Sequence, residues 1–309
     1  MVEPETGGDP EGKRRYVRVS LRRLAAWFRR RASHTTLGRL LRQFQFSLKT
    51  NVKRLTGPAH PDRNRQFRWI NKLRTLFLRH GAPVISTDTK NSVLIGNFKN
   101  PGPRWCRQAD EVLAHDFPGD ADCRAVPYGV YELGRNRAHV CVSISKDTSQ
   151  LAVNSIRDWW RRSGRRAYAE HRRLLILADS GGSNGCRVRL WKRELQRFAD
   201  ETGLTITVAH YPRGASKWNP VEHRLFGPIS QNWRGVPLRT LDTLLGYIRH
   251  TTTNTGLKVT AKLDRRTYRQ KIKVKDREMK QLNLRRQRTC PLWNYTLSPR
   301  TDPNNPGSN

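Results

Sequence analysis

Apolar residues recur every three or four positions in several segments, and this spacing predicts amphipathic helices. The segments are 20–31, 35–44, 65–80, a long one from Asp147 to about residue 166, and 186–202. The first two helices are short and are separated by a tight break. They resemble a helix-turn-helix with Arg39 and Arg42 on the outer side and Leu37, Leu40, Leu41 and Phe44 facing inward. An ordinary helical hairpin with a solvated basic face explains the same pattern equally well.

Short apolar runs that stop at glycine, proline or polar residues predict strands. They span 83–88, 93–98, 138–144, 174–178 and 204–209. The second run is expected to return antiparallel to the first, and residues 99–126, rich in Pro, Gly and Asp, to form an inserted loop. Because the later strands alternate with helices, we predict an α/β domain in which a mixed sheet is flanked by helices.

Two prolines in the stretch Gly57-Pro58-Ala59-His60-Pro61 cannot continue a helix and mark the predicted domain boundary. We expect three parts: a helix-turn-helix-like DNA-binding region at 1–56, shortened at its N-terminus, a central domain at 57–254, and a basic C-terminal extension at 255–309. The Lys and Arg clusters of the extension, at 271–280 and 285–288, are expected to contact the DNA backbone rather than the bases.

Charge changes the picture most. The chain of 309 residues has 60 Lys and Arg against 25 Asp and Glu, which gives a net charge of +35, and its pI is near 11.3. Such an excess favours a polyanionic partner, and nucleic acid is the usual one. A ribosomal or chromatin-like packing protein would also be basic, but nine Trp and several buried strands argue against it.

Cysteine use and hydropathy limit the cellular setting. The five cysteines, at 106, 123, 141, 186 and 290, are scattered and form no Cys-x-x-Cys pair, so neither a disulfide framework nor a zinc ribbon is indicated. The first residues lack a secretory pattern, and no apolar run is long enough to cross a membrane. We therefore expect a reduced, cytoplasmic and nucleoid-associated protein with no membrane partner.

Two carboxylates occupy positions that favour chemistry. Asp179 directly follows the buried run 174–178, and ligands of α/β sheets gather beside the carboxyl ends of strands. Glu222 falls in the first turn of a helix, since Asn219 is a good N-cap and Pro220 suits the first helical position. Locally, Glu222 is also explained as the end of a capping box, and the stretch after Asp179 as ordinary turn chemistry.

Several motifs together resemble those of the DDE insertion-sequence transposases of the ISAzo type, over about residues 20–298. The strand and helix order is also that of the ribonuclease-H-like fold of that family. The motifs are Ser33-His34-Thr35-Thr36, His60-Pro61-Asp62-Arg63, Ile95-Gly96-Asn97-Phe98-Lys99-Asn100, Val126-Pro127-Tyr128-Gly129, Asp179-Ser180-Gly181-Gly182-Ser183-Asn184-Gly185 and Lys217-Trp218-Asn219-Pro220-Val221-Glu222-His223.

The resemblance implies that Asp88, Asp179 and Glu222 form an acidic triad in a catalytic domain at 57–254. Clustered carboxylates repel one another unless a cation lies between them, and hard oxygen ligands suit Mg²⁺ or Mn²⁺. Two such ions would activate water or a 3′-hydroxyl for DNA cleavage and strand transfer. The implied partners are double-stranded DNA, as element ends and as target, and further copies of the chain when it is bound to DNA.

Other residues near these motifs are candidates for DNA contact, namely Lys90, Asn184, Lys217 and His223. His223 points about 100° away from Glu222 on a helix, so we interpret it as DNA-facing or packing. For Asn184 and Lys217, an ordinary solvated loop is an equally good explanation. Trp159 and Trp160 are expected in the core.

The chain departs from the family at Ser145 and Lys146, where an Asp-His pair is more usual. If that pair assists catalysis, activity is weakened. Two alternatives to a working transposase therefore stay open. One is an inactive or co-opted remnant that acts only as a basic DNA-binding protein, and the other is a structure-selective nuclease of the same fold.

Overall fold

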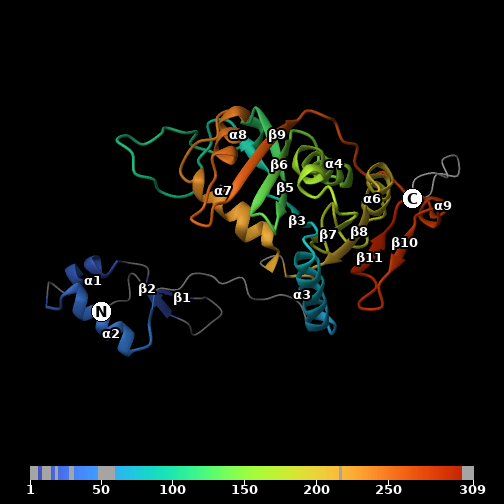
Figure 1. Ribbon diagram of the computed structural model, residues 1–309. Helices are drawn as coiled ribbons and strands as arrows, with labels where there is room; N and C mark the ends of the chain where they lie inside the picture. The colour runs from blue at the N-terminus through green and yellow to red at the C-terminus, as the bar shows by residue number, and fades with distance from the viewer. Residues whose placement is uncertain are drawn as a thin grey trace. The chain divides into compact units, whose positions relative to one another are not determined.

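The computed structural model describes residues 6–8, 15–17, 20–27, 31–47, 60–215 and 218–300. The chain divides into two compact units, Met1–Gly57 and Pro58–Asn309. Figure 1 shows the helices and strands of both. No helix in the described part of the chain is both long and apolar enough to cross a membrane.

The first unit contains two short strands and two helices. Strand β1 (Thr6–Gly8) pairs antiparallel with β2 (Arg15–Val17), and the helices are α1 (Leu21–Trp27) and α2 (His34–Gln43). The side chain of Ser33 accepts a hydrogen bond from the Thr36 N–H at 3.0 Å, which fixes the start of α2. Arg29 and Arg30, predicted to end the first helix, lie outside the described residues.

The two helices bury less than the sequence predicted. Leu24 and Leu37 are buried, and Gly38 lies so close to α1 that a Cβ there would be 3.1 Å from Leu21 Cδ1. Leu40 and Phe44, predicted to face inward, are exposed, Phe44 to 72%. That prediction was wrong because a helix pair this short covers only one side of α2.

The second unit is built on a nine-stranded mixed sheet. Its strand order is β10-β11-β8-β7-β3-β5-β6-β9, and β4 pairs with β5 off this path. The strands are β3 (Val84–Thr89), β4 (Val93–Ile95), β5 (Cys123–Glu132), β6 (Arg137–Ser143), β7 (Arg173–Ala178), β8 (Thr205–His210), β9 (Lys258–Asp264), β10 (Leu284–Arg286) and β11 (Asn294–Leu297). Strands β7 and β8 run parallel to β3, whereas β5 runs antiparallel to both β3 and β6. The central order β6-β5-β3-β7-β8 is that of a ribonuclease-H-like fold, as predicted.

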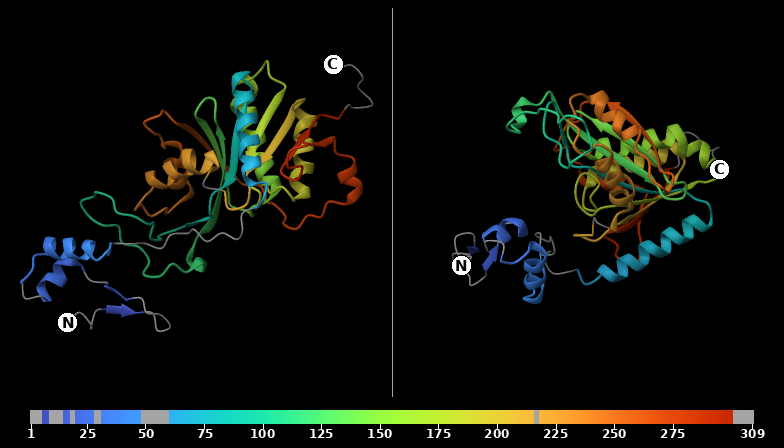
Figure 2. Two further views of the ribbon diagram at one scale, coloured as in Figure 1. Left: turned by 90° about the horizontal axis from the view of Figure 1, so that it is seen from below. Right: turned by 90° about the vertical axis from the view of Figure 1, so that its left-hand side faces the viewer.

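Helices cover both faces of this sheet. They are α3 (Arg63–Arg79), α4 (Ser149–Trp159), α5 (Arg165–Ala167), α6 (Arg189–Thr202), α7 (Gly227–Asn232), α8 (Leu241–Arg249) and α9 (Asp276–Lys280), with π-helical turns at Trp160–Gly164 and Glu222–Phe226 and a 3-10 turn at Pro118–Asp120. Side chains of β7 alternate: Leu174 and Ile176 pack with α4 and α6, whereas Leu175 and Leu177 pack with α3. Figure 2 shows α3 against the middle of the sheet.

Hydrophobic packing explains most of the predicted elements of this unit. Trp159 and Trp160 are buried, as expected. The Thr148 side chain accepts a hydrogen bond from the Leu151 N–H and begins α4. Gly203 ends α6 with a left-handed backbone, φ 69°. All five cysteines are free thiols.

The sheet departs from the prediction at its second strand. The antiparallel partner of β3 is β5, which begins inside the predicted loop 99–126. The return strand expected at 93–98 is instead the three-residue β4, which pairs with β5. Pro127 and Gly129 hid β5 in the sequence, because both are unusual inside strands. Residues 128–132 of β5 pair with β3, and residues 123–125 pair with β4. Pro127 lies between these two paired segments and is therefore tolerated.

The segment 255–309, expected to be a basic extension, contributes three strands to the sheet. Strand β9 pairs in parallel with the whole of β6, and β11 joins β8 and carries β10. The sequence prediction contained no strand here because Lys and Arg alternate with few apolar residues, and the pattern looks like a solvated surface.

Candidate active site

Asp88 and Asp179 lie at the same edge of the sheet because their strands are parallel neighbours. In the register of β3 and β7, Thr87 is opposite Ala178, so the two aspartates occupy the next positions on adjacent strands. Such strands are about 4.8 Å apart. Asp88 and Asp179 therefore lie side by side at the carboxyl ends of β3 and β7.

Glu222 reaches this edge through a close helix–sheet contact. The chain is helical from Pro220, and Glu222 begins the π-helical turn Glu222–Phe226. Gly129, which pairs with Asp88 across β3 and β5, lies under this turn, and a Cβ there would be 2.8 Å from Leu225 and Phe226. The glycine therefore allows the helix to pack beside the aspartates.

Asn219 links the elements of the site rather than capping the helix. Its buried amide nitrogen donates to Asp179 Oδ1 at 3.1 Å and approaches Asp88 Oδ2 at 3.5 Å. Its carbonyl oxygen accepts a short hydrogen bond from the Ser86 hydroxyl, which in turn accepts from the Val221 N–H at 3.0 Å. Neither the expected N-cap bond nor a capping box at Glu222 is present.

Burial raises the pKa of all three carboxyl groups, and neighbouring carboxylates raise the pKa of the two aspartates further. Burial and the charges of Asp179 and Glu222 raise the pKa of Asp88 from 3.8 to about 8. Burial and Glu222 raise the pKa of Asp179 to about 6, and burial raises the pKa of Glu222. Hydrogen bonds from Asn219 lower the pKa of both aspartates in part. The three groups therefore form one electrostatically coupled acidic cluster.

A buried histidine, His210, bonds the backbone of Asp179. His210 Nδ1 bonds the Asp179 carbonyl oxygen at 2.8 Å, and its Nε2 bonds the Tyr295 hydroxyl at 3.0 Å. Trp191 Nε1 donates to the same hydroxyl at 2.9 Å. Burial lowers the pKa of His210 to about 4, so the ring is neutral near pH 7 and serves as a fixed support.

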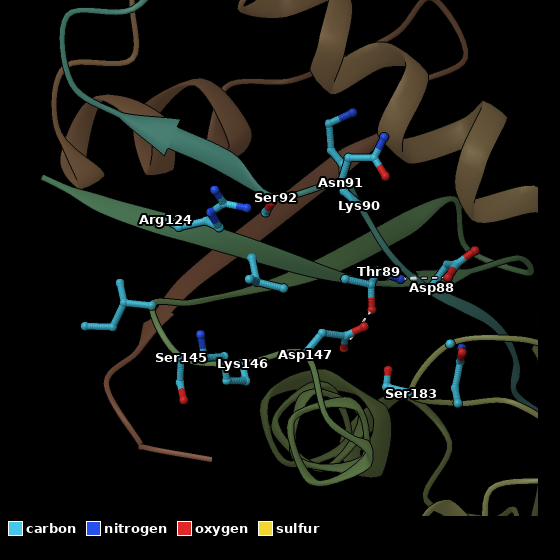
Figure 3. Close-up of a pocket in the computed structure, with 14 residues that line it drawn as sticks. Asp88, Thr89, Lys90, Asn91, Ser92, Arg124, Ser145, Lys146, Asp147 and Ser183 are labelled. Carbon is cyan, nitrogen blue, oxygen red and sulfur yellow. Dashed lines mark hydrogen bonds between the residues drawn. The ribbon is translucent and has the colours of Figure 1, made fainter. Parts of the chain in front are cut away.

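A pocket of about 500 Å³ opens beside Asp88. Thr89 joins two carboxylates at its floor: its N–H donates to Asp88 Oδ1 at 2.8 Å, and its hydroxyl donates to Asp147 Oδ1 at 3.2 Å. Figure 3 shows Thr89 between these two acids, with Arg124 and Lys146 further from Asp88. Asp147 was predicted only as the start of a long helix, and its pattern in the sequence did not indicate a position beside Asp88.

The residues predicted to contact DNA have different surroundings. Lys90 is half-buried: its Nζ donates to Ser230 Oγ at 2.6 Å and lies over the rings of Phe226 and Trp233. Burial lowers its pKa. Asn184 is buried and donates to the Thr87 carbonyl oxygen at 3.3 Å, so it does not present its side chain to solvent.

The other predicted contacts have a simpler position. His223 is exposed beside Glu222, and Arg39 and Arg42 are exposed on α2 of the first unit. Lys217 lies outside the described residues.

The donor set of the acidic cluster suits a hard divalent cation, because it consists of carboxylate oxygens, and the pKa values of the two aspartates are raised by burial and by neighbouring carboxylates. The carboxylate oxygens of the three acids do not all lie within 4.8 Å of one another. Among the described residues, the one group of three side chains whose ligand atoms lie within 4.8 Å of one another is His139, Cys141 and Asp158.

Ordinary contacts explain that second group. Lys262 Nζ lies 3.0 Å from Asp158 Oδ2 and Arg266 lies 3.6 Å away, so the carboxylate charge is already compensated. His139 Nδ1 bonds the Thr260 hydroxyl at 2.9 Å. Further positive charge there would be opposed by the two neighbouring cations.

The sheet order defines a ribonuclease-H-like domain, and three acidic residues lie near one edge of its sheet. The chain belongs to the family described as the Rhodopirellula transposase DDE domain, whose model matches residues 1–299. The sequence resemblance to DDE transposases is thereby confirmed.

Solved structures of Mos1 transposase are also similar to the chain. The paired-end complex with the left transposon end has a TM-score of 0.47 and 11% identity, and the paired-end complex with Mn has 0.45 and 13%. Each comparison covers 75% of this chain and 66% of the Mos1 chain, so the chain spans just under two thirds of that protein. No curated protein matches the chain.

Sequence reasoning missed the supports of the site. Ser86 and His210 lie inside apolar strands and gave no signal of their own. Asn219 was visible as part of a motif, but it was interpreted from its local position as a helix cap. Its contacts with two strands far away in the sequence decide its role instead.

Proposed function

We propose that the protein cleaves DNA and joins the freed 3′ end to target DNA, with Asp88, Asp179 and Glu222 as its catalytic carboxylates. The observation that carries the proposal is the electrostatic coupling of these three acids at one edge of the sheet. Family membership supports the reaction class, and the net charge of +35 supports a DNA partner.

In this proposal the three carboxylates hold Mg²⁺ or Mn²⁺, two ions in the working complex. When bound, such ions activate the attacking oxygen and stabilise the leaving oxygen of an in-line displacement. The chain supplies the remaining conditions. Asn219 keeps the two aspartates in place, His210 fixes the backbone of Asp179, and the half-buried Lys90 offers a positive charge near Glu222.

We further propose that the first unit binds element ends through the exposed Arg39 and Arg42 of α2, and that several copies of the chain act together on DNA. Arginines on a short exposed helix are suited to phosphate and base contacts. We also propose that His223, which is exposed beside Glu222, contacts DNA.

The test is a strand-transfer and nicking assay on supercoiled DNA with Mg²⁺ or Mn²⁺, repeated with EDTA. Asp88→Asn, Asp179→Asn and Glu222→Gln should each abolish both products while DNA binding is kept. Nicking without joined products would favour a structure-selective nuclease of the same fold. DNA binding without any metal-dependent product would favour the alternative of an inactive transposase remnant that only binds DNA.

A further inference from the structure

The pocket beside Asp88 combines three kinds of lining. Asp88 and Asp147 supply carboxyl groups, Val126 and Ile144 supply an apolar wall, and Arg124 and Lys146 supply positive charge. Ile144 is 41% exposed, although it is a large aliphatic side chain. A nucleotide has the matching combination, since base and sugar offer apolar faces and the phosphate is an anion.

Arg124 and Lys146 have no side-chain partner in the described part of the chain. Both are exposed, and neither forms a hydrogen bond or an ion pair through its side chain with a described residue. Lys90, in contrast, is occupied by Ser230 and two aromatic rings. The two unpaired cations are therefore the ones that can bind an anion without breaking an existing contact.

The strand register sets the distance over which these groups act. Thr89 is opposite Tyr128, and Arg124 lies four residues earlier on β5. Four residues of strand measure about 13 Å.

Asp147 limits where a phosphate can lie. Its carboxylate is held by Thr89 between Asp88 and the two cations, and it repels a phosphate in the middle of the pocket. A strand that enters the pocket is thus favoured when a phosphate lies at each end and the sugars and bases lie against Val126 and Ile144.

We propose that this pocket is the path of one DNA strand on one side of the scissile phosphodiester. The strand runs from Asp88 past Asp147, and Arg124 and Lys146 bind its phosphates. The inference rests on the proposed function, because it takes Asp88 as the point where the scissile phosphate is held.

The experiment compares Arg124→Ala/Lys146→Ala with a matched double variant, Arg137→Ala/Lys258→Ala. The control pair also removes one exposed Arg and one exposed Lys, on strands β6 and β9, where the two residues are opposite each other at the other end of the sheet. Nicking of supercoiled DNA with Mn²⁺ is measured at saturating protein, so that binding elsewhere on the chain does not limit the rate. We expect the pocket variant to be slower by about tenfold or more, because two charge-assisted contacts are lost, and the control to stay within about twofold of wild type. The single variant Lys146→Arg, which keeps the positive charge, should retain most of the wild-type nicking rate.

A second readout does not depend on activity. Lysine acetylation of the full chain is followed by mass spectrometry with and without a short single-stranded oligonucleotide. Lys146 should be protected by the oligonucleotide and Lys258 should not.

The outcomes separate this inference from the proposed function. If Asp88→Asn abolishes nicking but the pocket variant nicks like the control, or if Lys146 is labelled equally with and without DNA, the strand path is wrong and the active site stands. If Asp88→Asn still nicks, the proposed function fails and this inference fails with it.

Discussion

Replacing Asp88 by Asn should stabilise the fold while abolishing activity. A carboxyl whose pKa is raised from 3.8 to about 8 favours folding while it is protonated, and this contribution is lost as the pH rises from about 4 through about 8. Asparagine is neutral at every pH, so the variant avoids that loss. The gain should therefore increase as the pH rises over this range.

The magnitude follows from the shift. A rise from 3.8 to about 8 is about four pKa units, and at about 1.4 kcal/mol per unit it sets an upper limit of roughly 6 kcal/mol. The Asn side chain still accepts from the Thr89 N–H but loses the contact with the Asn219 amide, which costs about 1 kcal/mol. We expect a net gain of about 2–5 kcal/mol in the free energy of unfolding above pH 8.

The assay is guanidinium unfolding followed by tryptophan fluorescence in EDTA, at several pH values between 5 and 9. Asp120→Asn is the control, because Asp120 is exposed and its side chain bonds no described residue. Adding Mg²⁺ should stabilise the wild-type chain more than Asp88→Asn, so the difference in their free energies of unfolding should become smaller. The reasoning is refuted if the variant is no more stable than wild type above pH 8, or if its gain does not change with pH.

Three further substitutions test the supports of the site. Asn219→Ala should lower nicking by about tenfold or more and destabilise the fold by about 1–3 kcal/mol, since the buried Ser86 hydroxyl loses its hydrogen-bond acceptor. Activity equal to wild type would show that the amide is dispensable. Gly129→Ala should lower the free energy of unfolding by about 1–3 kcal/mol, because its Cβ would be 2.8 Å from the π-helical turn. The control Gly246→Ala, whose Cβ would have nothing within 4 Å, should stabilise α8 by about 0.5–1 kcal/mol. Equal effects of the two substitutions would contradict the close contact at Gly129. Thr148→Ala should lose about 1 kcal/mol in the same measurement, as expected for a helix cap, and an unchanged midpoint would count against the cap.

Local sequence signals predicted the parts of the fold that local physics decides. The apolar run of β7 ends at Asp179 and glycines follow it, so both the strand and the position of its carboxylate were evident. The order of strands and helices around it then predicted the ribonuclease-H-like sheet. The short helices of the first unit were also found, but two of their side chains were assigned to the wrong face.

Tertiary contacts decided the rest. Strand β5 contains Pro127 and Gly129, each of which is explained only by the ends of β3 and β4 and by the helix above them. The side chain of Asn219 bonds residues of β3 and β7 rather than its own helix. The bonds of Asn219 to Asp179 and Asp88 join residues 40 and 131 positions apart, so no local pattern can reveal them.

The place of the last strands has a consequence for synthesis of the protein. Both outer margins of the sheet, β9 at one side and β11 with β10 at the other, come from residues after 257. While the ribosome has yet to deliver them, β6 and β8 present unpaired backbone to solvent, which invites strand addition by other chains. A premature stop codon before residue 258 would therefore yield an aggregation-prone product, even though every proposed catalytic carboxylate would already have been translated.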